Sequence, residues 1–152
     1  MIRVRSRVAA YLPADGQSLY QLSMTDRDSR VGRWWRQADP QRYTPATIAA
    51  EGIVEVFCAD CGEADRRRLV ERHRAEAVPP LGTPVRLSAA RFGSVRRAYV
   101  HTTEDNAVSY ALQRSMLAAA GPASPVVTLR TSHLPMLTRP REVADAIVAA
   151  AR

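Results

Sequence analysis

Two side chains capable of acid–base chemistry, Asp105 and His133, each follow a short apolar run that is typical of a β-strand. The runs cover residues 98–101 and 126–129, and residues 107–120 between them have the apolar spacing of a helix. A strand, a helix and a second strand in this order predict two parallel strands joined by a right-handed crossover. Both loops then emerge at the carboxyl edge of the sheet, where ligands bind. An aspartate there would fix the tautomer of the histidine and stabilise the imidazolium that forms when the ring takes a proton.

Each of these residues also has a simpler interpretation. An aspartate just before a helix is most often an N-cap, and a loop histidine usually has no special role. Of the other two histidines, we expect His101 to be a satisfied residue inside the sheet and His73 to be solvated. The acid–base pair is therefore a hypothesis about which loops the fold brings together.

Three stretches of the chain resemble one protein family. They are AAYLPADGQSL at 9–19, LGTPVRLSAARFGSVRRAYVHTTEDNAVSYALQRSM at 81–116 and RTSHLPMLTRP at 130–140. Together they resemble the esterase and hydroxynitrile-lyase branch of the α/β-hydrolase superfamily, to which the plant methyl-ester esterases belong. The resemblance implies that Asp105 is the acid of a Ser-His-Asp triad and His133 its general base. It also implies that Leu134, beside the base, lines the substrate pocket.

The same resemblance implies an α/β fold. About three parallel strands with flanking helices would form an incomplete α/β-hydrolase core from residues 1–16 and 81–152. Residues 17–80 would form a helical cap inserted into that core. Trp34 and Trp35 lie in this segment, and adjacent side chains on one element cannot both face the same way, so at most one can face a pocket. We take Trp34 as the candidate for substrate binding.

The nucleophile of such a triad is missing from the sequence. In α/β-hydrolases it lies on a G-x-S-x-G turn between a strand and a helix, and no G-x-S-x-G occurs in these 152 residues. Ser94 has different flanking residues and precedes a predicted strand. The first half of the parallel sheet and the loop that supplies half of the oxyanion hole are not represented either. Loss of the nucleophile lowers the rate about as much as loss of the whole triad, ~10⁶-fold. The sequence therefore predicts a carboxylic-ester hydrolase ancestry for a chain that is inactive alone.

Two explanations of the missing half remain open. The chain could be a hydrolase fragment, from a truncated gene or a misassigned start, or a part that acts on a small-molecule ester once another chain supplies the missing half. Alternatively, it could be a non-catalytic interaction module or a homodimer built on the exposed sheet edge, because an unpaired strand and an uncovered apolar face attract partners. The lyases of the family place a lysine near the pocket, and this chain has none, which favours an esterase ancestry.

The composition argues against several other functions. The formal net charge is +7 and all 22 basic residues are arginines, but they are spread along the chain. No aromatic-studded strand accompanies them, so specific nucleic-acid binding is not expected. No apolar run reaches the ~20 residues of a membrane helix, and the start lacks the apolar stretch of a signal peptide, which favours a cytoplasmic protein. No cofactor is implied. Cys58 and Cys61 lack the further ligands of a zinc site and are expected to be reduced cap cysteines.

Local patterns predict the remaining elements. These are a strand over 3–12 and helices over 44–57, 63–77 and 140–151. Thr44 as N-cap followed by Pro45 marks the start of the first of these helices. In the last helix, the spacing places Val143 and Ile147 on the inward face.

Overall fold

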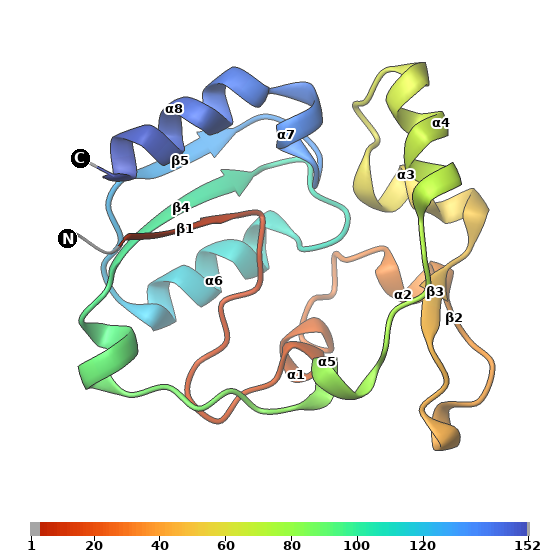
Figure 1. Ribbon diagram of the computed structural model, residues 1–152, viewed down its shortest axis with the longest axis horizontal. Helices are drawn as coiled ribbons and strands as arrows, with labels where there is room; N and C mark the ends of the chain where they lie inside the picture. Colours follow the sequence, from red (N-terminus) through yellow and green to blue (C-terminus); the bar gives the residue numbers. More distant parts are fainter. Residues whose placement is uncertain (1–3, 152) are drawn as a thin grey trace.

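A three-stranded parallel sheet, in the order β1-β4-β5, forms the centre of the computed structural model, which describes residues 4–151. Its strands are β1 (Val4–Val8), β4 (Arg96–Thr102) and β5 (Val126–Leu129). α6 (Tyr110–Ala120) connects β4 to β5 and lies on one face of the sheet, while α8 (Pro140–Ala151) covers the other (Figure 1). The predicted α/β class, with parallel strands and flanking helices, is confirmed.

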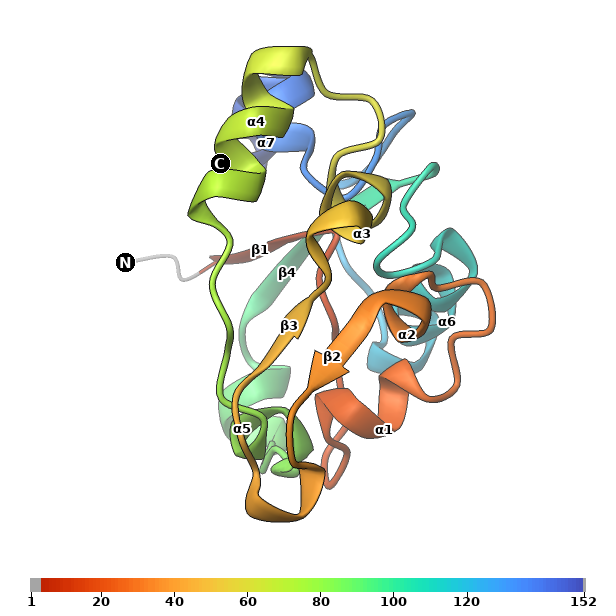
Figure 2. The same cartoon turned by 90° about the vertical axis from the view of Figure 1, so that its right-hand side faces the viewer.

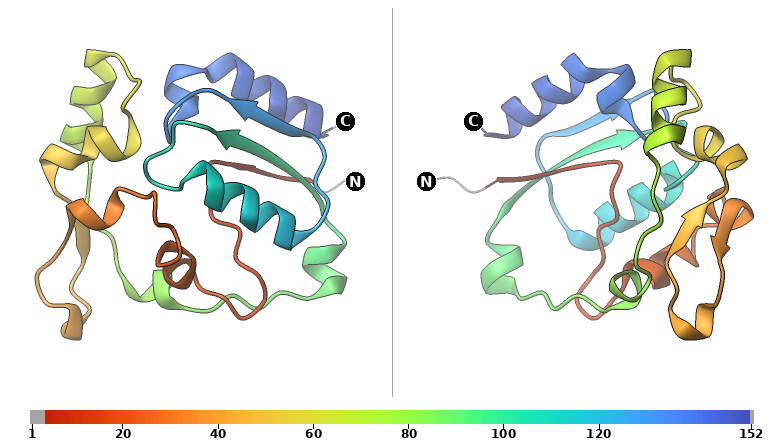
Figure 3. Two further views of the ribbon diagram at one scale, coloured as in Figure 1. Left: turned by 180° about the vertical axis from the view of Figure 1, so that it is seen from behind. Right: turned by 45° about the vertical axis from the view of Figure 1, so that its right-hand side comes forward.

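Successive residues of β4 face two different cores, because side chains alternate along a strand. Tyr99 belongs to a buried cluster with Leu112 and Met116 of α6. Val100, the next residue, belongs to a second cluster with Val143 of α8. Figure 3 (left) shows α6 in front of β4 and β1. Burying one such side chain contributes roughly 1.5–3 kcal/mol, so the two helices hold the sheet that carries the loops of interest.

The first strand is shorter than the sequence predicts. The pattern predicts a strand over 3–12, but β1 ends at Val8, and Arg3 lies outside the described residues. Ala9 has a φ of 48°, in the left-handed region, where a strand cannot continue. Its N–H still donates to the carbonyl oxygen of Val100 at 3.0 Å. Among the described residues, β1 has a hydrogen-bonded neighbour on one side only, which is β4.

Short elements between residues 19 and 82 lie beside the sheet (Figures 1 and 2). They are α1 (Leu19–Ser23), α2 (Val31–Trp34), β2 (Trp35–Gln37), η1 (Pro40–Arg42), β3 (Ala46–Ile48), α3 (Ala50–Phe57), α4 (Glu63–Arg72) and α5 (Pro79–Gly82). β2 and β3 form an antiparallel pair (Figure 2). A π-helical turn, η2 (Ala89–Gly93), then leads into β4.

The helix predicted over 44–57 is wrong in its first half. Residues 46–48 form β3, which pairs with β2, and α3 begins only at Ala50. Thr44 does not cap a helix, because its hydroxyl accepts a hydrogen bond from the N–H of Asp39 at 2.8 Å and closes the connection between the strands. The pairing of β3 with β2 therefore outweighs the local N-cap signal of Thr44 and Pro45.

The two other predicted helices agree better with the structure. α4 starts as predicted but ends at Arg72, because Glu76 exchanges backbone hydrogen bonds with Ala46 instead of continuing the helix. α8 spans the predicted residues, and Val143 is buried. Ile147 is 44% exposed, so its predicted inward orientation is wrong; the inward line continues at alanines three and seven residues after Val143. No helix within residues 4–151 is long and apolar enough to cross a membrane.

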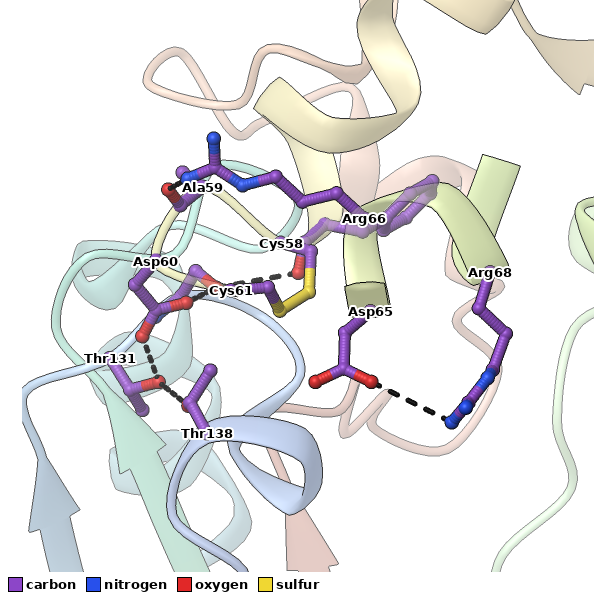
Figure 4. The surroundings of a disulfide bond; sticks show 11 residues. Cys58, Ala59, Asp60, Cys61, Asp65, Arg66, Arg68, Thr131 and Thr138 are labelled. Carbon is purple, nitrogen blue, oxygen red and sulfur yellow. Dashed lines mark hydrogen bonds and ion pairs between the residues drawn. A yellow bond between two sulfur atoms is a disulfide. The ribbon is translucent and has the colours of Figure 1, made fainter. Parts of the chain in front are cut away.

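Cys58 and Cys61 form a disulfide, so the prediction of two reduced cysteines is wrong (Figure 4). The N–H of Cys61 donates to the carbonyl oxygen of Cys58 at 3.1 Å and closes a tight turn after α3. This turn brings the two Cα atoms to 5.2 Å, within the range that a disulfide needs. The sequence spacing allowed such a turn but did not require it.

Candidate active site

Asp105 and His133 meet at the carboxyl ends of β4 and β5. Nδ1 of His133 lies 2.9 Å from Oδ2 of Asp105. The two loops are also joined through their backbones, since the N–H of Glu104 donates to the carbonyl oxygen of Thr131 at 3.1 Å. The parallel pairing of β4 with β5 is what places these loops side by side, as the sequence predicts.

The side chain of Asp105 is completely buried, with 0% of its surface exposed. It accepts five hydrogen bonds: on Oδ1 from the N–H of Ala107 (2.8 Å) and Val108 (2.9 Å), and on Oδ2 from the Thr102 hydroxyl (2.8 Å), the Gln113 amide (3.2 Å) and Nδ1 of His133 (2.9 Å). Backbone N–H groups and an amide nitrogen can only donate, so both oxygens act as acceptors, as in an ionised carboxylate. Nδ1 of His133 then acts as the donor to Oδ2, and in the neutral ring Nε2 would carry the lone pair.

Gln113, which was not among the residues predicted for the site, completes the surroundings of Asp105. This residue is fully buried on α6. Its amide nitrogen also donates to the hydroxyl of Thr102 at 3.0 Å, and its oxygen accepts the N–H of Thr102 at 3.0 Å. A glutamine between Leu112 and Met116, which face the core, is the signal that could have found it, because buried amides need hydrogen-bond partners.

Asp105 is not the N-cap of the helix that follows it. α6 begins at Tyr110 rather than near residue 107, and its N-cap is Ser109, whose Oγ accepts the N–H of Leu112 at 3.1 Å. Asp105 instead caps the turn ahead of the helix through Oδ1. Capping and the contact with His133 use different oxygens, so the carboxylate does both.

The imidazole of His133 has one nitrogen on the carboxylate and one available. Its side chain is 22% exposed, and the hydrogen bonds described for residues 4–151 include none to Nε2. The ring of Phe57, from the end of α3, lies 5.7 Å from the imidazole. Leu134 follows directly and is half-buried just before α7 (Pro135–Thr138). A hydroxyl group placed near Nε2 could donate to the imidazole, whose orientation is fixed by the contact of Nδ1 with Asp105 on the opposite side of the ring.

Trp34 is packed elsewhere. Its indole N–H donates to Oε2 of Glu55 at 3.0 Å, and the guanidinium of Arg33 lies 4.9 Å from its ring. A Cβ on Gly52 would overlap the Trp34 side chain, so the tryptophan packs directly on the backbone of α3. None of the hydrogen bonds or ring contacts of Trp34 described here joins it to His133. Its role in substrate binding stays a prediction.

The environments of His101 and His73 differ from those predicted. His101 is buried, and its Nδ1 has no hydrogen-bond partner within residues 4–151, so the prediction of a satisfied residue is wrong. The centroid of its ring lies 4.7 Å from that of Tyr99 and 5.5 Å from that of Tyr110. Burial lowers the pKa of the His101 imidazole. His73 is half-buried, with its ring 6.0 Å from that of Phe57, so it is not simply solvated.

A cavity of about 730 Å³ lies on the α6 side of the sheet, away from Asp105 and His133. Its apolar lining includes Leu12, Leu22, Phe92 and Met116, and none of the predicted site residues contributes to it. Within residues 4–151, no three His, Cys, Asp or Glu side chains come together as metal ligands would.

Comparison with known proteins identifies the family of the chain. The alpha/beta hydrolase family matches residues 3–146, which is most of the chain. The chain belongs to this family. Among solved structures of similar fold, polyneuridine aldehyde esterase superposes with a TM-score of 0.79 at 20% identity, over 99% of this chain and 63% of that one. A pyrethroid hydrolase from Sphingobium faniae JZ-2 superposes with a TM-score of 0.73 at 21% identity, over 96% and 59%.

A plant relative is more similar in sequence over a shorter stretch of this alpha/beta hydrolase. A chloroplastic protein of Arabidopsis thaliana, provisionally named methylesterase 11, is 33% identical over 73 residues, which are 48% of this chain and 19% of that protein. The predicted resemblance to the esterase-like branch of the family is thereby confirmed. The chain spans about a fifth of the plant protein and about three fifths of the solved relatives.

Proposed function

We propose that Asp105 and His133 are the acid and the general base of a Ser-His-Asp triad, and that this chain derives from a carboxylic-ester hydrolase. The observation that carries the proposal is the 2.9 Å contact between Nδ1 of His133 and a carboxylate that is fully buried and accepts five hydrogen bonds. The names of the relatives support a small carboxylic ester as substrate, and that of the plant protein a methyl ester.

In the proposed reaction, Nε2 of His133 takes the proton of a serine hydroxyl while the serine oxygen attacks the ester carbonyl. Asp105 stabilises the imidazolium that results. The imidazolium then gives its proton to the leaving alcohol, and an acyl-serine remains until water, activated by the same base, releases the acid. These 152 residues contain no G-x-S-x-G turn that could carry this serine. The backbone N–H that follows the serine and contributes to the oxyanion hole is therefore not supplied by such a turn in this chain either.

We further propose the division into a core of residues 1–16 and 81–152 and a cap of residues 17–80. Two features support it. α3 and α4 lie beyond the carboxyl ends of β4 and β5 (Figure 1), and this segment contacts the loop of Asp105, since the side-chain amide of Asn106 donates to the carbonyl oxygen of Glu55 at 2.8 Å. A substrate would lie between cap and base, where Leu134 and Trp34 are the candidate contacts.

Turnover of p-nitrophenyl acetate by the purified 152-residue chain and by a His133→Ala variant tests the proposal that the nucleophile lies outside this chain. We expect equal, background rates, because a general base without a nucleophile supports no efficient turnover. Turnover that disappears in the variant would contradict that part of the proposal, since it would reveal a nucleophile or an activated water within this chain, while leaving His133 as its base.

The coding DNA upstream of Met1 tests where the nucleophile is. The proposal predicts a segment, in frame or frameshifted, that encodes a strand, a G-x-S-x-G turn and a helix. Unrelated DNA would contradict a truncated gene or a misassigned start and would favour a second candidate function.

That second candidate is a non-catalytic interaction module, and the one-sided pairing of β1 favours it. An open strand edge is a template for another strand. Two copies paired through β1 would bring Arg5 and Arg7 of both chains together, and like charges on facing strands are unfavourable, so a homodimer is a poorer fit than an acidic partner strand. Sedimentation over a range of concentrations separates the outcomes: mass that doubles with concentration supports a homodimer, and a constant monomer mass excludes it.

A further inference from the structure

The end of α3 and the turn that follows it reach the loop of His133 with two side chains. Phe57 places its ring 5.7 Å from the imidazole, and Asp60 lies on the turn closed by the Cys58–Cys61 disulfide. Figure 4 shows Asp60 directed from this turn towards Thr131. The segment is about seventy residues earlier in the chain than the loop, so this contact depends on the fold and not on sequence proximity.

The carboxylate of Asp60 binds the two residues that precede His133. Oδ2 accepts the hydroxyl of Thr131 at 2.6 Å and the N–H of Ser132 at 3.1 Å, and Oδ1 accepts the hydroxyl of Ser132. Thr131 is 0% exposed and Ser132 1% exposed. Without Asp60, two buried hydroxyls and one backbone N–H would each lose an acceptor, and a buried donor without a partner is unfavourable.

The charge of Asp60 suits this role. Burial alone would raise the pKa of its carboxyl group, but the hydrogen bonds donated by Ser132 and Thr131 outweigh burial and lower that pKa. The carboxylate is therefore ionised at neutral pH and can accept three hydrogen bonds at once. No neighbouring basic side chain forms an ion pair with it among the described residues, so its partners are the donors of the histidine loop.

We propose that Asp60 is a positioning residue for His133: it fixes the Thr131–Ser132 backbone, so that the imidazole keeps Nδ1 on Asp105 and presents Nε2 towards the proposed cap. The idea rests on the proposed function of His133. It assigns to Asp60 no contact with the substrate or the reacting atoms. It also gives a reason for a carboxylate at position 60, since closing the turn between Cys58 and Cys61 does not itself require a charged side chain.

The nitrogen chemical shifts of His133, measured through its ring protons, give a readout that a purely structural role would not move. In the Nδ1–H tautomer the two nitrogens differ strongly, and exchange between tautomers makes their shifts converge. We expect well-separated shifts in the wild type and convergence in Asp60→Ala, with partial convergence in Asp60→Asn, which keeps one acceptor oxygen. The matched control is Asp65→Ala, four residues after Cys61, because within residues 4–151 this carboxylate pairs with Arg68 at 3.7 Å and has no hydrogen bond to the loop of His133.

Shifts that remain separated in a folded Asp60→Ala variant would overturn the proposal. Should that variant fail to fold, Thr131→Val removes one hydroxyl donor to Asp60 with little change of shape, and the same convergence is expected. A separate variant distinguishes failure of the proposed function from failure of this proposal. If Asp105 does not orient His133, Asp105→Asn leaves the His133 nitrogen shifts unchanged, whatever the Asp60 variants show.

Discussion

Two regions of the parallel sheet differ in how completely this chain satisfies their polar groups: the carboxyl ends of β4 and β5, and the open side of β1. At the carboxyl ends of β4 and β5, the buried carboxylate of Asp105 has a donor for each of its five hydrogen bonds within the chain. Along β1, by contrast, the described residues provide a neighbour on one side only, and Arg5 lies directly opposite Arg97 in the register with β4. The hydrogen bonds around the Asp105–His133 contact are complete within the described residues, whereas strand pairing along β1 is one-sided. The geometry proposed for proton transfer therefore forms without a second neighbour for β1.

Removing Asp105 should have the largest effect, because it leaves buried donors without an acceptor. We expect Asp105→Ala to lower the free energy of unfolding by roughly 3–5 kcal/mol, as when one partner of a buried polar network is deleted. Urea unfolding measures the change. Asp65→Ala, at a half-buried position whose ion pair with Arg68 spans 3.7 Å, serves as control, with an expected change within about 0.5 kcal/mol. A similar loss of unfolding free energy in both variants would mean that the hydrogen bonds around Asp105 contribute no special stability.

Gln113 should come next in magnitude. Gln113→Leu removes a donor to Asp105 and the acceptor for the N–H of Thr102, so we expect unfolding to become easier by roughly 1–3 kcal/mol. Ser115→Ala, on the exposed side of the same helix, controls for helix propensity. An unchanged stability in Gln113→Leu would show that the amide is dispensable to the cluster.

His101 should make stability depend on pH. Because burial lowers its pKa in the folded state, the unfolded chain binds a proton more readily, and stability falls as the pH decreases below the ordinary histidine value of about 6.5. Tyr99 and Tyr110 flank the ring, and Arg114 adds to the lowering of its pKa. Above that pH the effect is absent. Urea unfolding from pH 8 to pH 5 measures how the free energy of unfolding changes with pH. In His101→Phe this change should be smaller than in the wild type by up to about 1.4 kcal/mol per pH unit. Identical pH dependence in the two proteins would contradict a lowered pKa of His101.

The smallest expected effect, and one of opposite sign, concerns the flank of the sheet. Arg5→Thr removes a like-charge pair with Arg97, so we expect a gain of roughly 0.2–1 kcal/mol in the free energy of unfolding. Raising the salt concentration from about 0.01 M to about 0.15 M should reduce that gain, because exposed charges are screened. Arg36→Thr on β2 is the control, since Arg36 lies opposite Thr47 and not opposite another arginine. A loss of stability in Arg5→Thr would mean that the arginines support the edge.

Sequence reasoning predicted well those features that depend on local pattern and topology. Residues 126–129 form an apolar, β-branched run after a proline, and β5 has those bounds; Pro140 opens α8 as predicted. The meeting of Asp105 with His133 was a hypothesis that two parallel strands made possible and that the family resemblance strengthened. β3 could not be predicted in this way, because Ala46–Ile48 becomes a strand only by pairing with β2. Asp60 was missed for the same reason, since its partners lie about seventy residues further along the chain.

The central claim is that Asp105 holds His133 as a base with an available Nε2. The measurement that tests it most directly is the tautomer of His133 at neutral pH, from its ring-nitrogen chemical shifts in the wild type and in Asp105→Asn. We predict an Nδ1–H tautomer in the wild type, and a loss of that preference in the variant. An Nε2–H tautomer in the wild type, or a preference that does not change when Asp105 is replaced, would contradict the claim.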